Sequence, residues 1–222
     1  SSDVCSSDLT KEELTQLGEL AVKHDLLILS DEIWSDIVFA PHVFTSMASL
    51  DESVKERTIT ITGFSKSYGL AGLRIGAILT TNARHFETIY RHSQHNATVH
   101  GANILGQVAA SAAINECQGW LTDFVRHLQQ MRDITVAGLN KVNGFQCIAP
   151  EGCYVAFANI KDTEMDSAAV HALLLDKAKV AVVPGLPKWF GDGAAGYIRL
   201  SFATSEQILE EALLKIKNVF EK

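Results

Sequence analysis

Short apolar or β-branched runs alternate with segments of helical periodicity in the first half of this chain, and this alternation restricts the fold most strongly. The runs LLIL (Leu26–Leu29), TITIT (Thr58–Thr62) and RIGAILTT (Arg74–Thr81) have the lengths and residue types of β-strands. LLIL is apolar at every position, as in a strand that is buried on both faces. Strands that alternate with helices at such spacings predict an α/β fold with a mostly parallel sheet.

Helical patterns flank these strands. The segment Thr10–Glu13 has a hydroxyl at the first position and a carboxylate three residues later, so it predicts a capping box and a helix that begins there. Apolar residues at helical spacing over Gly101–Glu116 indicate a buried helix. A further apolar stripe after Gly119 indicates a helix long enough to bridge two domains.

The order of elements changes after Gly119. Short strand-like runs surround one helix near Ser167–Lys179, and an amphipathic helix ends the chain. We expect residues 10–118 to form the C-terminal part of a large domain and residues 119–222 to form a small α+β domain with its connecting helix. Residues 1–9 are polar and contain SSD twice, so we interpret them as a disordered or non-native leader.

Composition excludes several classes of function. The 222 residues carry a net charge of −7 without a basic run, which argues against a nucleic-acid or anionic-membrane partner. No apolar run approaches the roughly 18–20 residues that cross a bilayer. The four cysteines form no C-x-x-C pair, and His92, His95 and His100 have no acidic or cysteine neighbour. We therefore expect a cytoplasmic protein without a metal site.

Two charged residues follow strand-like runs at the point where each strand ends. Asp31 comes just after LLIL, and Lys66 follows TITIT and the tight turn Gly63–Ser65. Ligands of open α/β sheets bind outside the carboxyl ends of the strands, where both side chains would lie. There are alternatives to a ligand-binding role: Asp31 could be a helix cap or turn residue, and Lys66 could be a solvent-facing lysine. A desolvated lysine amine is nucleophilic and can form an imine with an aldehyde.

Two arginines stand at unusual positions. Arg74 begins the third strand-like run after the small loop GLAG, and its planar donor fork suits a phosphate. Arg199 lies within the apolar run GYIRLSFA, where a buried guanidinium needs an anionic partner. A structural salt bridge would supply that partner, and so would a carboxylate ligand.

An acid, a lysine and two arginines form a set that matches one reagent. Pyridoxal 5′-phosphate combines a pyridine nitrogen, an aldehyde and a phosphate. This cofactor performs the carbanion chemistry itself, while protein groups tune and orient it. The residue set therefore predicts pyridoxal 5′-phosphate as the cofactor.

The sequence resembles the C-terminal portion of the class I/II pyridoxal-phosphate-dependent aminotransferases of fold type I, the aspartate-aminotransferase-like enzymes. GFSKSYGLAGLRIG (Gly63–Gly76) fits the lysine signature of that family at every position. SDEIWSDIVF (Ser30–Phe39) resembles the D-E-[IV]-Y segment, and Val182–Ala203 resembles the segment with the carboxylate-binding arginine. The three segments occur in the expected order, and the resemblance covers roughly Thr10–Lys222.

The resemblance implies a role for each of these residues. Lys66 would form the Schiff base with the cofactor and shuttle a proton as general acid/base. Asp31 would pair with the protonated pyridine nitrogen, while Arg74, with help from Ser65, would bind the phosphate. Arg199 would hold the α-carboxylate of the substrate. The implied protein is a homodimer with shared sites that transfers an amino group from an α-amino acid to a 2-oxo acid.

Two features depart from the family pattern. Trp34 replaces the usual tyrosine beside the cofactor ring, and its indole N–H can donate a hydrogen bond but cannot ionise like a phenol. The related carbon–sulfur β-lyases (cystathionine β-lyase-like) also depart from tyrosine there, so they remain an alternative. A non-catalytic, aminotransferase-like ligand-sensing domain is another. Family members are also nearly twice as long, and their N-P-x-N-P-T-G loop would precede Thr10.

Overall fold

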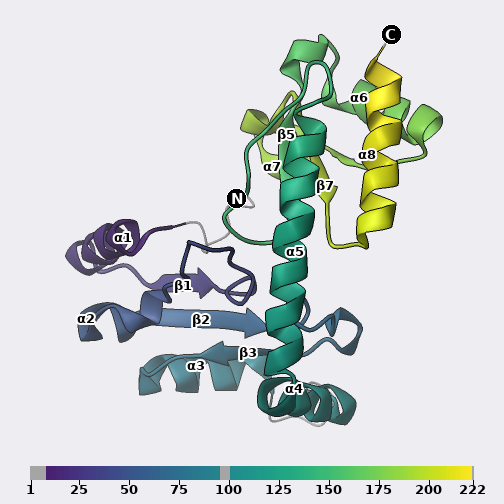
Figure 1. The fold of residues 1–222 in the computed structure, drawn as a ribbon. Coiled ribbons are helices and arrows are strands. Elements are labelled where there is room, and N and C mark those ends of the chain that lie inside the picture. Colours follow the sequence, from purple (N-terminus) through teal and green to yellow (C-terminus); the bar gives the residue numbers. More distant parts are fainter. Residues whose placement is uncertain (1–8, 96–100, 222) are drawn as a thin grey trace. The chain divides into compact units, whose positions relative to one another are not determined.

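The computed structural model describes residues 9–95 and 101–221, which form two compact units (Figure 1). The described residues up to Asp123 form the first unit, and those from Phe124 onward form the second. The division falls within α5 (Gln118–Leu139), the long helix that the apolar stripe after Gly119 predicted. The predicted leader, apart from Leu9, lies outside the described residues.

The first unit is an α/β unit built on three strands. Its elements, in chain order, are α1 (Lys11–Lys23), β1 (Ile28–Asp31), η2 (Met47–Ser49), α2 (Glu52–Lys55), β2 (Thr58–Gly63), η3 (Ala71–Leu73), β3 (Gly76–Leu79), α3 (Ala83–Ser93) and α4 (Ile104–Glu116). Figure 1 shows β2 between β1 and β3. β1 runs parallel to β2, and β3 runs antiparallel to it.

Local chemistry explains where α1 begins. The backbone N–H of Glu13 donates to the Thr10 hydroxyl at 3.2 Å, and the Thr10 N–H donates to the Glu13 carboxylate at 2.8 Å. This reciprocal arrangement confirms the predicted capping box and satisfies donors that a helix end leaves free. Leu14 of α1 then packs with Met47 and Val54 in a small buried cluster.

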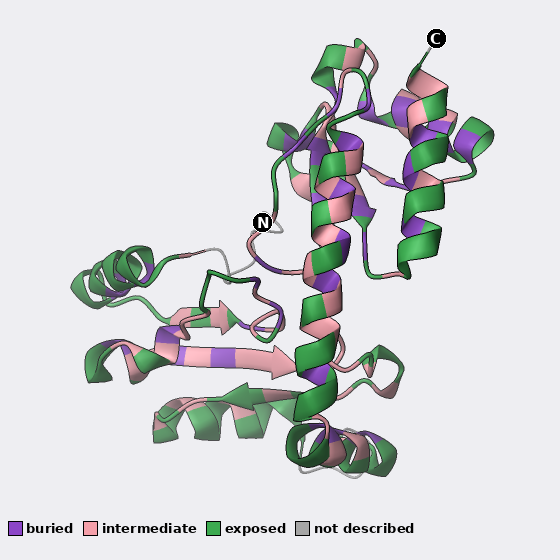
Figure 2. Cartoon of the chain, in the orientation of Figure 1, coloured by how far each residue is buried: buried purple, intermediate pink, exposed green. Residues whose placement is uncertain are grey.

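Two predictions of burial in the first unit are wrong. The strand predicted at Leu26–Leu29 spans Ile28–Asp31, and the Leu29 side chain is 65% exposed. The helix predicted as buried begins at Ile104, and its Leu105 is 73% exposed. Both elements are apolar, but no other part of the described chain covers these side chains, and Figure 2 accordingly colours much of β1 and α4 green and pink.

The second unit has a four-stranded antiparallel sheet and most of the fully buried side chains (Figure 2). Besides most of α5, its elements are β4 (Gln146–Cys147), β5 (Val155–Asn159), η4 (Lys161–Thr163), α6 (Ser167–Leu173), η5 (Leu174–Ala178), β6 (Val183–Pro184), α7 (Pro187–Phe190), η6 (Asp192–Ala194), β7 (Tyr197–Ser201) and α8 (Glu206–Phe220). The strand order is β4-β5-β7-β6. The helix predicted near Ser167–Lys179 consists of α6 and a π-helical turn. Among the described residues, no helix is long and apolar enough to cross a membrane.

Candidate active site

The candidate site lies along the sheet edge where β1 and β2 end. The two strands run in the same direction, so the turns that follow them leave the sheet at one edge. Residues 64–75 connect β2 to β3 at this edge, because Gly63 pairs with Gly76. Five of the predicted site residues therefore lie along it: Asp31, Trp34, Ser65, Lys66 and Arg74.

Asp31 and Glu32 are adjacent carboxylates with opposite environments. Asp31 is exposed at the end of β1, and its Oδ1 accepts a hydrogen bond from the Ile33 N–H at 3.2 Å. Glu32 is buried, and its Oε1 accepts from the Ser30 hydroxyl, the Ser46 hydroxyl (both 2.9 Å) and the Met47 N–H (3.3 Å). Glu32 is thus a structural anchor, whereas the Asp31 carboxylate is presented at the sheet edge.

Lys66 and Trp34 come together from the two turns. Lys66 lies three residues beyond β2, is half-buried, and places its Nζ 4.9 Å from the centroid of the Trp34 ring. A lysine cation over an indole face is attracted by the ring quadrupole. This contact holds the amine near the turn that carries Asp31.

Arg74 is positioned by an unusual backbone conformation. It does not begin the third strand, as the sequence predicted, but ends η3 with φ 51° and ψ 46° before β3 starts. Non-glycine residues rarely adopt this left-handed region, and such positions cluster at functional sites. The Arg74 side chain is exposed, and the residue precedes the first pair of the β2–β3 ladder.

Asn103 is a supporting residue that sequence reasoning missed. Its Nδ2 donates to the carbonyl of Leu73 at 2.7 Å, and its Oδ1 accepts from the Gly106 N–H at 2.7 Å. It therefore caps α4 and, at the same time, ties that helix to the residue before Arg74. The N-cap preference of asparagine before an apolar helix was a usable signal for the cap, but nothing in the sequence links it to Leu73.

Tyr68 lies in the Lys66 turn and was also missed. The Gln118 side-chain amide donates to its hydroxyl at 3.1 Å, and its ring stacks with that of Trp120 at a centroid distance of 6.1 Å. Partial burial, followed by the nearby Asp36 carboxylate, raises the pKa of the Tyr68 phenol, and the Gln118 hydrogen bond opposes this shift. The phenol is therefore a neutral, anchored group at neutral pH.

Arg199 belongs to the second unit and lies within β7, as predicted. It pairs with Phe157 of β5 and Val183 of β6, so it occupies an inner strand of the sheet. Its guanidinium carbon lies 5.3 Å from the centroid of the Phe190 ring. The Phe190 ring thus lies beside this half-buried cation, and the planar donor fork of the guanidinium suits a carboxylate.

The first unit thus presents an amine, a carboxylate, a hydroxyl and a guanidinium along the carboxyl edge of an α/β sheet. This is the place where α/β domains bind their ligands, and these groups are complementary to a phosphorylated aldehyde with a basic ring nitrogen. The described chain thus consists of an α/β unit that presents these groups at its sheet edge and a second, α+β unit.

The chain belongs to the aminotransferase class I and II family, whose model matches residues 4–216. It is 36% identical over 216 residues to aromatic-amino-acid aminotransferase 2 of Thermococcus litoralis, covering 96% of this chain and 54% of that protein. Its fold resembles the crystal structure of an aromatic aminotransferase from Pyrococcus horikoshii OT3, with a TM-score of 0.86 and 31% identity, covering 96% of this chain and 56% of the other.

Cystalysin from Treponema denticola is a further structural relative. The TM-score is 0.86 at 26% identity, covering 95% of this chain and 53% of the other, and that structure contains a pyridoxal 5′-phosphate cofactor. These neighbours confirm the predicted fold type I architecture. The chain spans about half the length of the relatives it matches.

Proposed function

We propose that this protein is a pyridoxal-5′-phosphate-dependent aminotransferase that transfers an amino group from an α-amino acid to a 2-oxo acid. The observation that carries the proposal is that Lys66, Asp31 and Arg74 lie along one sheet edge. The aminotransferase names of the sequence relatives and the cofactor in the cystalysin structure support it.

The residues of this edge fit the chemical groups of the cofactor. The Lys66 amine suits the aldehyde and would hold the cofactor covalently, and the Asp31 carboxylate would suit the pyridine nitrogen in its protonated form. Ser65 and Arg74 supply a hydroxyl and a guanidinium for the phosphate. The bound cofactor supplies an electron sink for the carbanion formed at the substrate Cα.

Each side chain then has a specific task during the reaction. Lys66 accepts the proton from the substrate Cα and returns it, while Arg199 holds the substrate α-carboxylate so that the Cα–H bond is oriented for cleavage. Trp34 restricts the Lys66 side chain through the 4.9 Å contact. The identity of the substrate side chain depends on groups beyond this set.

The complete protein, reconstituted with pyridoxal phosphate, tests this reaction directly. Incubation with an amino acid and a 2-oxo acid should produce the exchanged pair, which chromatography detects. Trp34 favours a second candidate, a carbon–sulfur β-lyase, because this residue replaces the usual tyrosine. Release of pyruvate and ammonia from a cysteine-type substrate without any 2-oxo acid would establish the lyase and contradict the aminotransferase.

Substitution of Arg199 tests how the substrate is held. We expect Arg199→Ala to raise KM for both substrates about 10–100-fold, because a charge-assisted bond to a carboxylate is lost. Arg199→Lys should give an intermediate KM, since lysine keeps the charge but lacks the planar fork. Steady-state kinetics with Lys161→Ala, which removes an exposed cation 5.2 Å from the Tyr197 ring, provides the control. An unchanged KM in Arg199→Ala would contradict the assignment.

We also propose that the protein is a homodimer that uses α4 as part of its interface. Ile104, Leu105 and Val108 lie on one face of this helix and are 77%, 73% and 63% exposed. An exposed apolar face on a helix without a charged side is typical of a surface that another chain covers. Because most oligomers are symmetric assemblies of identical chains, we expect that other chain to be a second copy of this protein.

Light scattering after size-exclusion chromatography tests the dimer. We expect Leu105→Glu to shift the complete protein from dimer to monomer, because it introduces a charge into the apolar face. Ile148→Glu alters another exposed apolar side chain, 88% exposed, and should leave the mass unchanged. A dimer that persists in Leu105→Glu would place the interface elsewhere.

A cytoplasmic location is part of this proposal. Cys117 and Cys147 are free thiols in the described chain, and burial raises the pKa of the Cys147 thiol to about 11. Unpaired thiols are typical of proteins from reducing compartments. Fractionation of cells, followed by detection of the protein with an antibody, tests this location.

A further inference from the structure

One hydrogen bond connects the two turns that form the candidate active site. The Ser67 hydroxyl donates to Oδ2 of Asp36 at 2.6 Å. Ser67 is completely buried, whereas Asp36 is exposed. A hydroxyl that bonds to a carboxylate at this short distance forms one of the stronger hydrogen bonds of proteins.

The location of this bond relates it to Lys66. Ser67 directly follows Lys66, and Asp36 lies two residues after Trp34, so the bond joins the same two turns as the contact between the Lys66 amine and the Trp34 ring. A lysine side chain has four rotatable bonds, and its reach is defined only if its backbone is fixed. The Asp36–Ser67 bond fixes the backbone one residue beyond Lys66 relative to the turn that carries Asp31.

We propose that the Asp36–Ser67 hydrogen bond positions Lys66, so that its amine meets the aldehyde of the cofactor while Asp31 faces the ring. Ser67 and Asp36 are positioning residues, which act through the placement of Lys66 and need no contact with the cofactor. This inference rests on the proposed function, because it assigns a geometric requirement to the same site.

Two ligands separate positioning from general stability. Pyridoxal phosphate binds through its ring and phosphate and also links covalently to an amine, whereas pyridoxine phosphate has the same ring and phosphate but no aldehyde. A positioning role predicts that loss of the Asp36–Ser67 bond impairs the covalent link alone. A purely structural role predicts equal losses for both ligands.

The experiment uses Ser67→Ala in the complete protein. Titration with pyridoxal phosphate, followed by borohydride reduction and peptide mass spectrometry, measures attachment at Lys66, and calorimetry measures binding of pyridoxine phosphate. We expect attachment to weaken about tenfold or more, the range for a hydrogen bond to a charged group. Binding of pyridoxine phosphate should stay within about twofold, as for substitutions away from the contacted groups.

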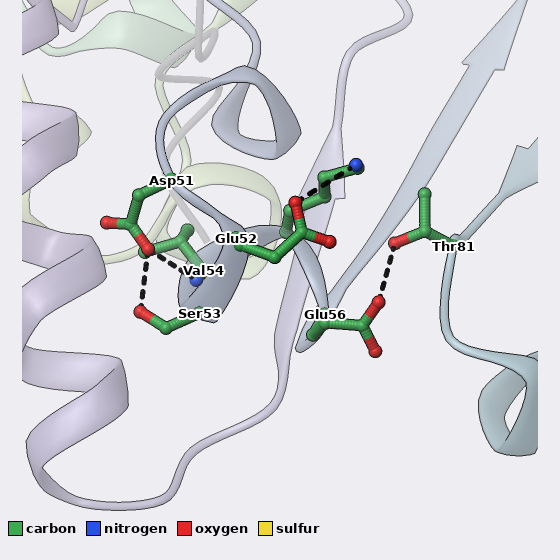
Figure 3. A network of polar contacts seen from close by, with 7 residues as sticks. Asp51, Glu52, Ser53, Val54, Glu56 and Thr81 are labelled. Atoms are coloured by element: carbon green, nitrogen blue, oxygen red, sulfur yellow. Dashed lines mark hydrogen bonds and ion pairs between the residues drawn. The ribbon is translucent and has the colours of Figure 1, made fainter.

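Ser53→Ala is the matched control. Figure 3 shows the hydrogen bond between Ser53 and Asp51. The Ser53 hydroxyl donates to Oδ1 of Asp51 at 2.6 Å, which is also the length of the bond between Ser67 and Asp36. This second bond lies in the first turn of α2, which precedes β2 and is therefore at the opposite edge of the sheet. Ser53→Ala should bind both ligands as the wild type does.

Variants at Asp36 provide a second, independent test. Asp36→Ala should reproduce the loss of attachment without leaving a buried cavity, because Asp36 is exposed. Asp36→Asn should restore attachment to within about threefold of wild type, since the amide oxygen accepts the same hydrogen bond. These two variants decide the question if Ser67→Ala fails to fold.

The possible results lead to distinct conclusions. Attachment that is unchanged in Ser67→Ala and in Asp36→Ala, or a loss that is equal for the two ligands, would overturn the positioning role. Wild-type protein that does not attach pyridoxal phosphate at Lys66 would instead refute the proposed function itself. Selective loss of attachment, with recovery in Asp36→Asn, establishes the inference.

Discussion

Replacing Lys66 with alanine is expected to lower the turnover of the complete enzyme by on the order of 10⁴-fold, the upper end of the range for loss of general acid–base catalysis. The reason is that the same amine both links the cofactor and moves the Cα proton. Lys66 is half-buried, and its amine lies against the Trp34 ring at the sheet edge. Burst kinetics and steady-state rates with a saturating amino acid provide the measurement.

Lys55→Ala serves as the control for the Lys66 variant. Lys55 pairs with Glu52 at 3.2 Å in the short helix α2, so its loss removes one cation without affecting the candidate site. Its rate should equal that of the wild type, because a surface ion pair contributes little to stability. Activity in Lys66→Ala within tenfold of wild type would show that another group carries the chemistry.

Asp31→Asn is expected to lower kcat by about 10²–10³-fold, as for the loss of one preorganised electrostatic contact in other enzymes. Asparagine keeps the Oδ1 acceptor that bonds the Ile33 N–H at 3.2 Å, so the turn is preserved. It removes the negative charge that would hold the cofactor nitrogen in its protonated form. The attachment of the cofactor to Lys66 should persist, which separates this effect from that of Lys66→Ala.

The neighbouring Glu32 offers a matched control for Asp31. Glu32→Gln removes the same unit of charge, and its amide oxygen can accept the bonds that Oε1 now accepts from Ser30, Ser46 and the Met47 N–H. We expect its kcat to stay within about threefold of wild type, as for substitutions that keep their bonds. If the two variants lose activity equally, Asp31 has no specific role.

Much of the framework followed from local patterns. The capping box at Thr10, the strand at Thr58 and the strand that carries Arg199 were predicted, because each depends on the residues within one short segment. The order of strand, charged residue and turn also predicted that Asp31 and Lys66 lie along one edge. Parallel strands place their carboxyl ends together whatever the rest of the chain does.

Burial was the property that local patterns failed to predict. LLIL and the apolar segment before Glu116 read as buried elements, yet Leu29 and Leu105 are largely exposed. Apolar composition measures the tendency of a segment to leave water, while burial requires a second surface that covers it. Within the described chain, nothing supplies that surface for these two elements.

The sequence alone fixed the kinds of chemical groups and the sheet edge along which they lie, because residue identity and strand direction are local properties of the chain. Folding in three dimensions selected Asp31 over Glu32 as the presented carboxylate, placed Trp34 against Lys66, and bonded Ser67 to Asp36. Two of these features are contacts between side chains of separate segments. The other depends on which of two neighbouring carboxylate side chains is buried and which is exposed. They depend on how the backbone packs, and no spacing rule along one segment specifies them.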